Sequence, residues 1–309
     1  MLANFLDKSK PINFIGLFVF FFISFSRSAY LLFLKDDFSI NNLLDLSLFL
    51  LFFICIFFFY NFILSKNKLT FDNSYGYFIF SLLVICILPA LFSYKTLFLF
   101  LFYTLFLRKI YSLKSNKNVL EKLFDIGFWL GICFLIEPIT LFFIVLIYLS
   151  VYLFKKITLH TVFAPILGFI IPLILYISYL LWQDENVNLL NEFNFLLNFE
   201  TTIYSDTKYA TYLMFILVVT FLSFILKSKD ALSINNSFRK SWLLLAFNFV
   251  LGIFLILLNE NKGVELLIFI LFPVSIIITN GIEMIPKKLI KSLALFILLF
   301  GCLFFSFYL

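Results

Sequence analysis

Eleven apolar runs alternate with short polar gaps along the whole chain. Most of the runs approach the roughly 20 residues that a helix needs to cross the hydrocarbon core of a bilayer. In lipid, a lone segment of this length satisfies its backbone only as a helix. We therefore expect an all-α, polytopic integral membrane helical bundle of 11 spans in a single transmembrane domain, residues 1–309. The runs cover residues 14–34, 46–64, 77–93, 96–107, 126–136, 139–154, 161–182, 211–226, 243–258, 264–282 and 292–309.

Two runs, 96–107 and 126–136, are shorter than a full crossing. Either flanking residues extend them, or they form partial helices packed inside the bundle. Glu137 and Pro138 separate the second short run from residues 139–154. A charge beside a proline that suits the first position of a helix predicts a tight turn there. The expected number of spans is therefore 11, with nine or ten as alternatives.

The basic residues are unevenly distributed between the gaps. Short loops rich in Lys and Arg remain in the cytoplasm. This bias predicts a cytoplasmic N-terminus, an outward C-terminus and a first run that is an uncleaved span in the bacterial inner (cytoplasmic) membrane. Every second gap, counted from the N-terminus, together holds 18 of the 23 basic residues: Lys8, Lys10, Lys66, Lys68, Arg108, Lys109, Lys114, Lys117, Lys122, Lys155, Lys156, Lys227, Lys229, Arg239, Lys240, Lys287, Lys288 and Lys291.

The composition supports lipid as the solvent of the chain. Hydrophobic residues make up 63% and charged residues 13%, with a mean hydropathy of +1.10. A soluble domain carries about a quarter charged residues. The net charge of +6 is accounted for by the cytoplasmic loops, so we expect the bilayer as a partner and no nucleic acid. The four cysteines lie within apolar runs without a CxxC spacing, and His160 is the single histidine, so no metal site is expected.

Three features are candidates for function. Arg27 lies within the first run, where a charge costs several kcal/mol unless it is paired or hydrated. The alternative is a structural ion pair or a position nearer the interface. Asp36 and Asp37 follow the first run directly, and adjacent carboxylates at a membrane mouth can act as a base or hold a divalent cation. The alternative there is a solvated acidic loop. Glu137 lies in a turn on the same predicted side.

The spacing along the first helix suggests which acid could approach Arg27. Asp36 follows Arg27 by nine residues, which is roughly 13–14 Å of helix at 1.5 Å per residue. The Asp36–Asp37 pair is then out of direct reach unless the loop folds back. We therefore expect Arg27 to point into a polar cavity open to the outer side, with Glu137 lining the same cavity.

The middle of the chain resembles an enzyme superfamily. FDIGFWLGICFLIEPITLFFIVLIYLSVYLFKK, followed by APILGFIIPLILYISYLLW, is similar to part of the GT-C superfamily of polyprenyl-phosphate-sugar-dependent glycosyltransferases, and ELLIFILFPVSIIITNGIEMI resembles their late helix with a central proline. The resemblance implies a polyprenyl-phosphate-linked sugar as a substrate and Asp36 or Asp37 as the catalytic base or metal ligand. Arg27 and Glu137 are the candidate substrate-binding residues. The first outer loop is shorter than in those enzymes.

Two further segments, MLANFLDKSKPINF and SLKSNKNVLEKLFDIGFW, resemble more narrowly an uncharacterised polytopic membrane protein family of Bacteroidetes. Taken together, these features predict a bacterial inner-membrane protein of cell-envelope assembly, a GT-C-like glycosyltransferase with a lipid-phosphate sugar donor. The alternatives are a non-catalytic membrane scaffold or complex subunit, which would bind a partner through its acidic outer loops, and a small-solute transporter. No Walker, GxSxG or HExxH motif occurs, which argues against ATP-driven or serine-hydrolase chemistry.

Overall fold

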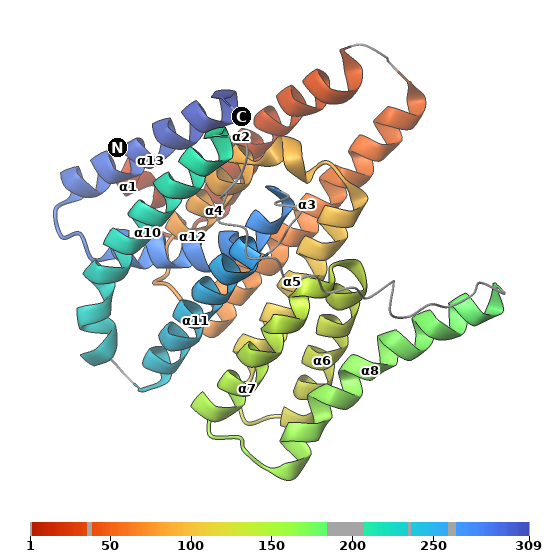
Figure 1. Cartoon of the computed structure of the whole chain (residues 1–309). Helices are drawn as coiled ribbons and strands as arrows, with labels where there is room; N and C mark the ends of the chain where they lie inside the picture. Colours follow the sequence, from red (N-terminus) through yellow and green to blue (C-terminus); the bar gives the residue numbers. More distant parts are fainter. Residues whose placement is uncertain (1, 36–38, 184–206, 234–235, 259–263, 309) are drawn as a thin grey trace.

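The computed structural model describes residues 2–35, 39–183, 207–233, 236–258 and 264–308, and every regular element in these ranges is helical (Figure 1). The all-α prediction is therefore confirmed. Within the described residues, each of the 11 apolar runs falls mainly on one or two of these helices. The elements are α1 (Leu2–Leu6), α2 (Pro11–Ala29), η1 (Tyr30–Leu34), α3 (Ile40–Asn67), α4 (Tyr75–Cys86), η2 (Leu88–Leu91), α5 (Tyr94–Ser112), α6 (Val119–Ile136), η3 (Pro138–Phe143), α7 (Ile144–Leu153), α8 (Leu159–Trp182), α10 (Thr207–Ser233), α11 (Asn236–Leu258), η4 (Val264–Leu267), α12 (Ile268–Glu283) and α13 (Lys288–Tyr308).

Among the described residues, seven helices are long and apolar enough to cross a membrane. These helices indicate a membrane protein. The number of 11 membrane crossings and the orientation of the chain remain predictions. The seven segments are Pro11–Phe33, Ile40–Asn67, Leu159–Trp182, Tyr209–Ser228, Phe238–Leu258, Glu265–Glu283 and Lys288–Phe307.

The two short apolar runs belong to helices longer than the runs themselves. Helix α5 continues through Arg108 and Lys109 to Ser112, and α6 begins at Val119, before its apolar run. Flanking residues thus extend both helices, which confirms the first of the two alternatives. Glu137 then ends α6 in an extended conformation and Pro138 starts η3, so the predicted turn is confirmed. The proline fits because the first position of a helix needs no N–H donor.

Helix α12 forms the centre of the bundle. Buried residues make up 94% of its span, against 22–50% in the other six long segments, and it lies in the middle of the molecule (Figure 1). Pro273 inside α12 has no N–H to donate, so the carbonyl of Phe269 loses its helical partner. The hydroxyl of Tyr103 lies 3.2 Å from this carbonyl and 2.8 Å from Oδ1 of Asn248. Side chains therefore satisfy the backbone where the proline interrupts it.

Helix α8 packs on α6 along a seam of small residues. A Cβ atom at Gly131 of α6 would lie 2.7 Å from the carbonyl oxygen of Phe169. A Cβ atom at Gly127 would lie 1.9 Å from the carbonyl oxygen of Pro165, and one at Gly168 would lie 2.1 Å from that of Phe124, which is closer still. Small residues spaced four apart allow such close approach of membrane helices. Beyond this seam α8 is mostly exposed, and in Figure 1 it extends away from the other helices.

Candidate functional site

Asp36 and Asp37 lie outside the described residues. Arg27 is described and half-buried near the end of α2. Its Nη1 donates a hydrogen bond of 3.4 Å to the carbonyl of Ser306, and its guanidinium carbon lies 3.7 Å from the centre of the Phe307 ring. Both contacts are with the last turns of α13. Cations near a helix C-terminus also interact favourably with its dipole.

Glu137 has a different partner. Its carboxylate accepts a hydrogen bond of 2.9 Å from the ammonium of Lys95, and the pair bridges the start of α5 and the end of α6. The backbone carbonyl of Glu137 also accepts from the hydroxyl of Thr140. The described contacts of Arg27 and Glu137 therefore lie on different helices. Their predicted common cavity stays a prediction.

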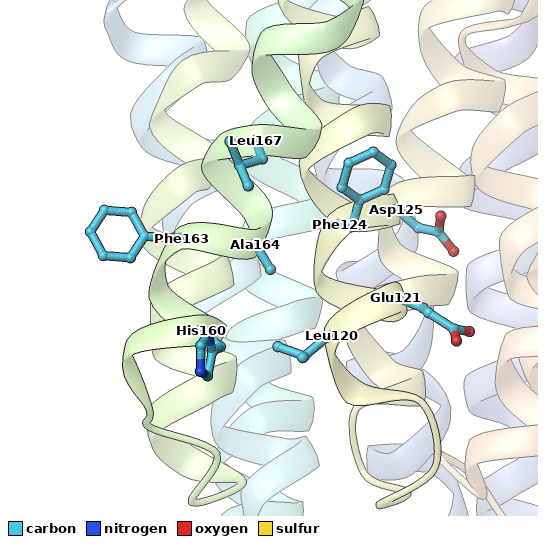
Figure 2. Close-up of a pocket in the computed structure, with 8 residues that line it drawn as sticks. All are labelled: Leu120, Glu121, Phe124, Asp125, His160, Phe163, Ala164 and Leu167. Carbon is cyan, nitrogen blue, oxygen red and sulfur yellow. The ribbon is translucent and has the colours of Figure 1, made fainter.

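A groove between α6 and α8 contains the only histidine of the chain (Figure 2). In Figure 2 the carboxylates of Glu121 and Asp125 point away from α8 and from His160. Each has another partner: Asn118 donates to Glu121, and Lys109 pairs with Asp125. Acid–base catalysis needs its groups within hydrogen-bond reach of a common point. This groove is therefore a weaker candidate than the cavity beside the α3–α4 loop.

A larger cavity of about 700 Å³ opens at the end of the bundle that carries most of the basic residues. Residues Ser65, Lys68, Phe71 and Asp72 at its mouth are exposed, whereas Tyr77 and Lys227 deeper inside are buried. The full lining is Ser9, Phe14, Asn61, Leu64, Ser65, Lys68, Thr70, Phe71, Asp72, Asn73, Tyr77, Lys227, Phe238, Asn280 and Glu283.

The loop between α3 and α4 builds the mouth of this cavity. Lys68 ends α3 with a positive φ of 52°, which turns the chain sharply, and the hydroxyl of Ser9 then donates to Asp72. Lys114 from the loop between α5 and α6 donates a hydrogen bond of 3.3 Å to the carbonyl of Asn67. Burial, followed by the charge of Lys68, lowers the pKa of Lys114 below its usual value. Lys68 and Lys114 thus lie close to one another beside the mouth, which also carries Asp72.

Lys227 brings a cation into the wall of the cavity. Only 2% of this residue is exposed, although it belongs to a helix that is long and apolar enough to cross a membrane. Its ammonium lies 3.4 Å from the sulfur of Met284 and 5.0 Å from the centre of the Phe71 ring, and it interacts electrostatically with the carboxylate of Glu283. A charged side chain inside a membrane bundle is costly, and such residues commonly mark functional sites.

Polar groups of α12 complete the wall. The side chain of Glu283 accepts hydrogen bonds from the backbone N–H of Phe71 at 2.9 Å and from the amide of Asn73 at 2.6 Å. Asn280, one turn earlier, donates to the carbonyls of Leu69 at 3.0 Å and of Ile276 at 2.9 Å. These bonds hold the α3–α4 loop against α12. The arrangement offers cations, acceptors and apolar surface to one ligand.

This site is not predicted from the sequence, because the charge pattern places Lys227 in a loop and the candidate acids lie on the predicted outer side. One usable signal was present: Asn280 and Glu283 close an otherwise apolar run, and polar residues at a helix end face either water or a partner. The positions that complete the cavity are separated by some 200 residues, such as Asn73 and Glu283, whose hydrogen bond joins residues 210 apart.

The chain matches the model of the Family of unknown function (DUF6427) over residues 1–308. No curated protein and no solved structure matches the chain. The family model covers almost the full length, including the cavity residues and both ends of the bundle. The expected resemblance to an uncharacterised family is confirmed at this level, and the chain belongs to the Family of unknown function (DUF6427).

Proposed function

We propose that the protein acts in the bacterial inner membrane, in cell-envelope assembly, by binding the phosphate-bearing headgroup of a lipid in the cavity at its basic end. The observation that carries this proposal is the buried ammonium of Lys227 in the cavity wall. Lys68 adds a second cation at the mouth. Lysine ammonium groups bind phosphate through charge-assisted hydrogen bonds.

The lining also suits the rest of a lipid. The apolar side chains of Phe14, Leu64 and Phe238 face the same cavity as the two lysines. Ligand sites in proteins combine a largely apolar wall with a few placed polar groups. A headgroup in the cavity would therefore have apolar surface beside it for the start of an acyl or prenyl chain.

Substitution of Lys68 tests the proposal, since its side chain is exposed and it lies just after the last residue of α3. The purified protein in detergent would be titrated with phosphatidic acid, and bound lipid counted by native mass spectrometry. We expect Lys68→Gln to weaken binding about tenfold, the size of one charge-assisted hydrogen bond. Lys66→Gln, two residues away and outside the lining, is the matched control and should leave binding unchanged. Equal behaviour of both variants would contradict the proposal.

A second candidate function is the transfer of a sugar from a polyprenyl-phosphate donor at the outer side. Arg27 favours it, because its contacts are a carbonyl and an aromatic ring, and neither ion pair among the described residues includes it. Within the part of the chain that the structure describes, its charge is therefore available to a phosphate. Asp36 or Asp37 would be the base or metal ligand in this reaction, and Glu137 a further substrate contact. The alternative is a non-catalytic membrane scaffold or complex subunit that binds a partner through its acidic outer loops.

Replacing Asp36 and Asp37 together by Asn separates these two roles. A transferase loses its activity, because Asn neither accepts a proton nor binds a divalent cation as a carboxylate does. A scaffold tolerates the change. The measurement is the glycolipid profile of a deletion strain complemented with either form, with Glu265→Gln as a control for the loss of a negative charge. An unchanged glycan profile in the deletion strain itself would rule out the transferase.

A further inference from the structure

Two acceptor atoms in the cavity wall have unused hydrogen-bonding capacity. Oδ1 of Asn280 and Oε2 of Glu283 are buried, and neither accepts a hydrogen bond from the part of the chain that the structure describes. Asn280 is only 1% exposed. A buried acceptor without a partner costs about 1–3 kcal/mol, so native proteins rarely leave one unfilled. Both residues line the cavity, where a ligand can reach them.

Their orientation is fixed by the bonds that they do make. Nδ2 of Asn280 donates to two carbonyls, those of Leu69 and Ile276. A flipped amide would place its oxygen against both carbonyl oxygens, so the hydrogen-bond network defines which atom is Oδ1. In Glu283, Oε1 accepts hydrogen bonds from the backbone N–H of Phe71 and from the side-chain amide of Asn73. Oε2 therefore remains available to another donor. The two free acceptors are therefore held in place before any ligand binds.

The charges of the lining indicate what kind of donor fits. The cavity carries two cations, Lys68 and Lys227, and two carboxylates, Asp72 and Glu283. Their formal charges cancel, so the lining as a whole favours a ligand without a large net charge. It offers cations at Lys68 and Lys227 and, on α12, the carboxylate of Glu283, whose Oε2 is a free acceptor, together with the second free acceptor at Asn280. A zwitterion with an N–H-bearing ammonium group complements this combination of charges and acceptors.

We propose that the cavity recognises a zwitterionic phosphate–ammonium headgroup of the phosphoethanolamine type. The phosphate lies toward Lys68 and Lys227, and the ammonium donates to Oδ1 of Asn280 and Oε2 of Glu283. This inference rests on the proposed function, since it specifies which phosphate headgroup the cavity binds. It adds Asn280 and Glu283 as the residues that determine specificity.

Three lipids with identical acyl chains isolate the contribution of the ammonium. Phosphatidic acid has the phosphate alone, phosphatidylcholine has an ammonium without N–H, and phosphatidylethanolamine has an ammonium with N–H donors. We expect the protein in detergent to bind phosphatidylethanolamine at least tenfold more tightly than the other two, measured by native mass spectrometry. Free O-phosphoethanolamine, added as a competitor, distinguishes a lipid site from one for the soluble headgroup. If the free headgroup displaces the lipid, the cavity binds the soluble headgroup as well. If the lipid is retained, its acyl chains add to the affinity. The headgroup chemistry is the same in both cases.

Glu283→Gln is the decisive variant. Gln keeps Oε1 as an acceptor for Phe71 and Asn73, so the loop stays attached, but it turns the second acceptor into a donor. We expect the preference for phosphatidylethanolamine to fall about tenfold. Binding of phosphatidic acid should not weaken, because the substitution removes a negative charge beside Lys227. Retained binding of phosphatidic acid also shows that the variant is folded. Glu265→Gln, at η4 before the other end of α12, is the matched control.

The outcomes separate the two proposals. If the native protein binds none of the three lipids, the proposed function and this inference both fail. If it binds all three equally and Glu283→Gln changes nothing, the headgroup assignment is wrong while phosphate binding stands. Equal binding of phosphatidylcholine and phosphatidylethanolamine would also overturn it, because hydrogen bonding to Asn280 and Glu283 would then contribute nothing.

Discussion

Arg27 shows how a single cation can be accommodated in an apolar helix. Its guanidinium covers the ring of Phe307 and donates to the carbonyl of Ser306, so a ring face and a helix end replace the carboxylate that a buried arginine commonly pairs with. Cation–π contacts stabilise by about 0.5–1 kcal/mol at exposed sites and about 2 kcal/mol when they are desolvated. At half-burial the contact belongs between these values.

Arg27→Met should therefore lower the free energy of unfolding by about 1–2 kcal/mol, because both contacts with α13 disappear while the aliphatic volume is kept. The check is a thermal melt of the purified protein in detergent, compared with Lys35→Met. Lys35 is an exposed cation one residue after η1 and serves as the control. An unchanged melting temperature in Arg27→Met would show that α13 does not depend on this residue.

Substitution of Glu137 tests its functional role with little effect on the stability of the protein. Its partner Lys95 is 56% exposed, and pairs of this kind contribute about 0–1 kcal/mol. Glu137→Gln should therefore melt within 1–2 °C of the parent protein by this estimate. Any large loss of complementation in a deletion strain would then report its role as a substrate contact, as the sequence predicts. Full complementation would remove Glu137 from the candidate residues.

At the level of elements, the α6–α8 seam is the most sensitive packing contact. Gly168→Ala would place a methyl group against the backbone of Phe124 and 3.0 Å from the N atom of Phe128, and backbone cannot rotate away as a side chain can. We expect a loss of about 1–3 kcal/mol, as in other overpacked contacts. Melting of the variant in detergent measures it.

Gly16→Ala in α2 is the matched control. Its nearest neighbour would be the Phe5 ring at 3.8 Å, an ordinary van der Waals contact. Replacing a glycine inside a helix by alanine gains about 0.5–1 kcal/mol where space allows. The two substitutions should therefore shift the melting temperature in opposite directions. A shift of the same sign and size in both would mean that the seam is looser than its geometry indicates.

The existence of the helices was predictable because each apolar run is local in sequence. Their ends were not, since α5 and α6 continue through Arg108, Lys109 and Glu121, whose long side chains can reach water from a helical backbone. The turn at Glu137–Pro138 was predictable because the proline imposes it locally. The close α6–α8 contact was not identified, although glycines four apart, as at Gly127 and Gly131, are its sequence signal.

For the whole molecule, the cavity opens at the same end of the bundle as the loops rich in Lys and Arg. The mouth of the cavity lies among the loops that hold most of the basic residues, so the orientation decides which leaflet supplies the ligand. We expect a reporter fused at Leu190 to lie outside and one fused at Asn235 in the cytoplasm. Alkaline phosphatase and fluorescent-protein activities measure this. A cytoplasmic signal at Leu190 would reverse the threading and place the cavity toward the outer leaflet.

The cavity itself could not be predicted, because its parts are distant in the sequence. Lys68 ends α3, Lys227 comes from α10, and Asn280 and Glu283 come from α12. No periodicity within one helix reports which other helix it will contact. The polar residues near the helix ends can be read from the sequence, but only the folded structure shows that they line one cavity.

The contact between Arg27 and the end of α13 also bears on how the chain is made. It joins residues 279 positions apart, in the first and the last long helix. Arg27 therefore enters the membrane long before its partner has left the ribosome. Until then its charge has to be met by water or by lipid phosphates at the bilayer surface. The bundle closes around this residue only after α13 has been made, so a chain truncated before α13 leaves an arginine without these contacts that quality-control proteases can recognise.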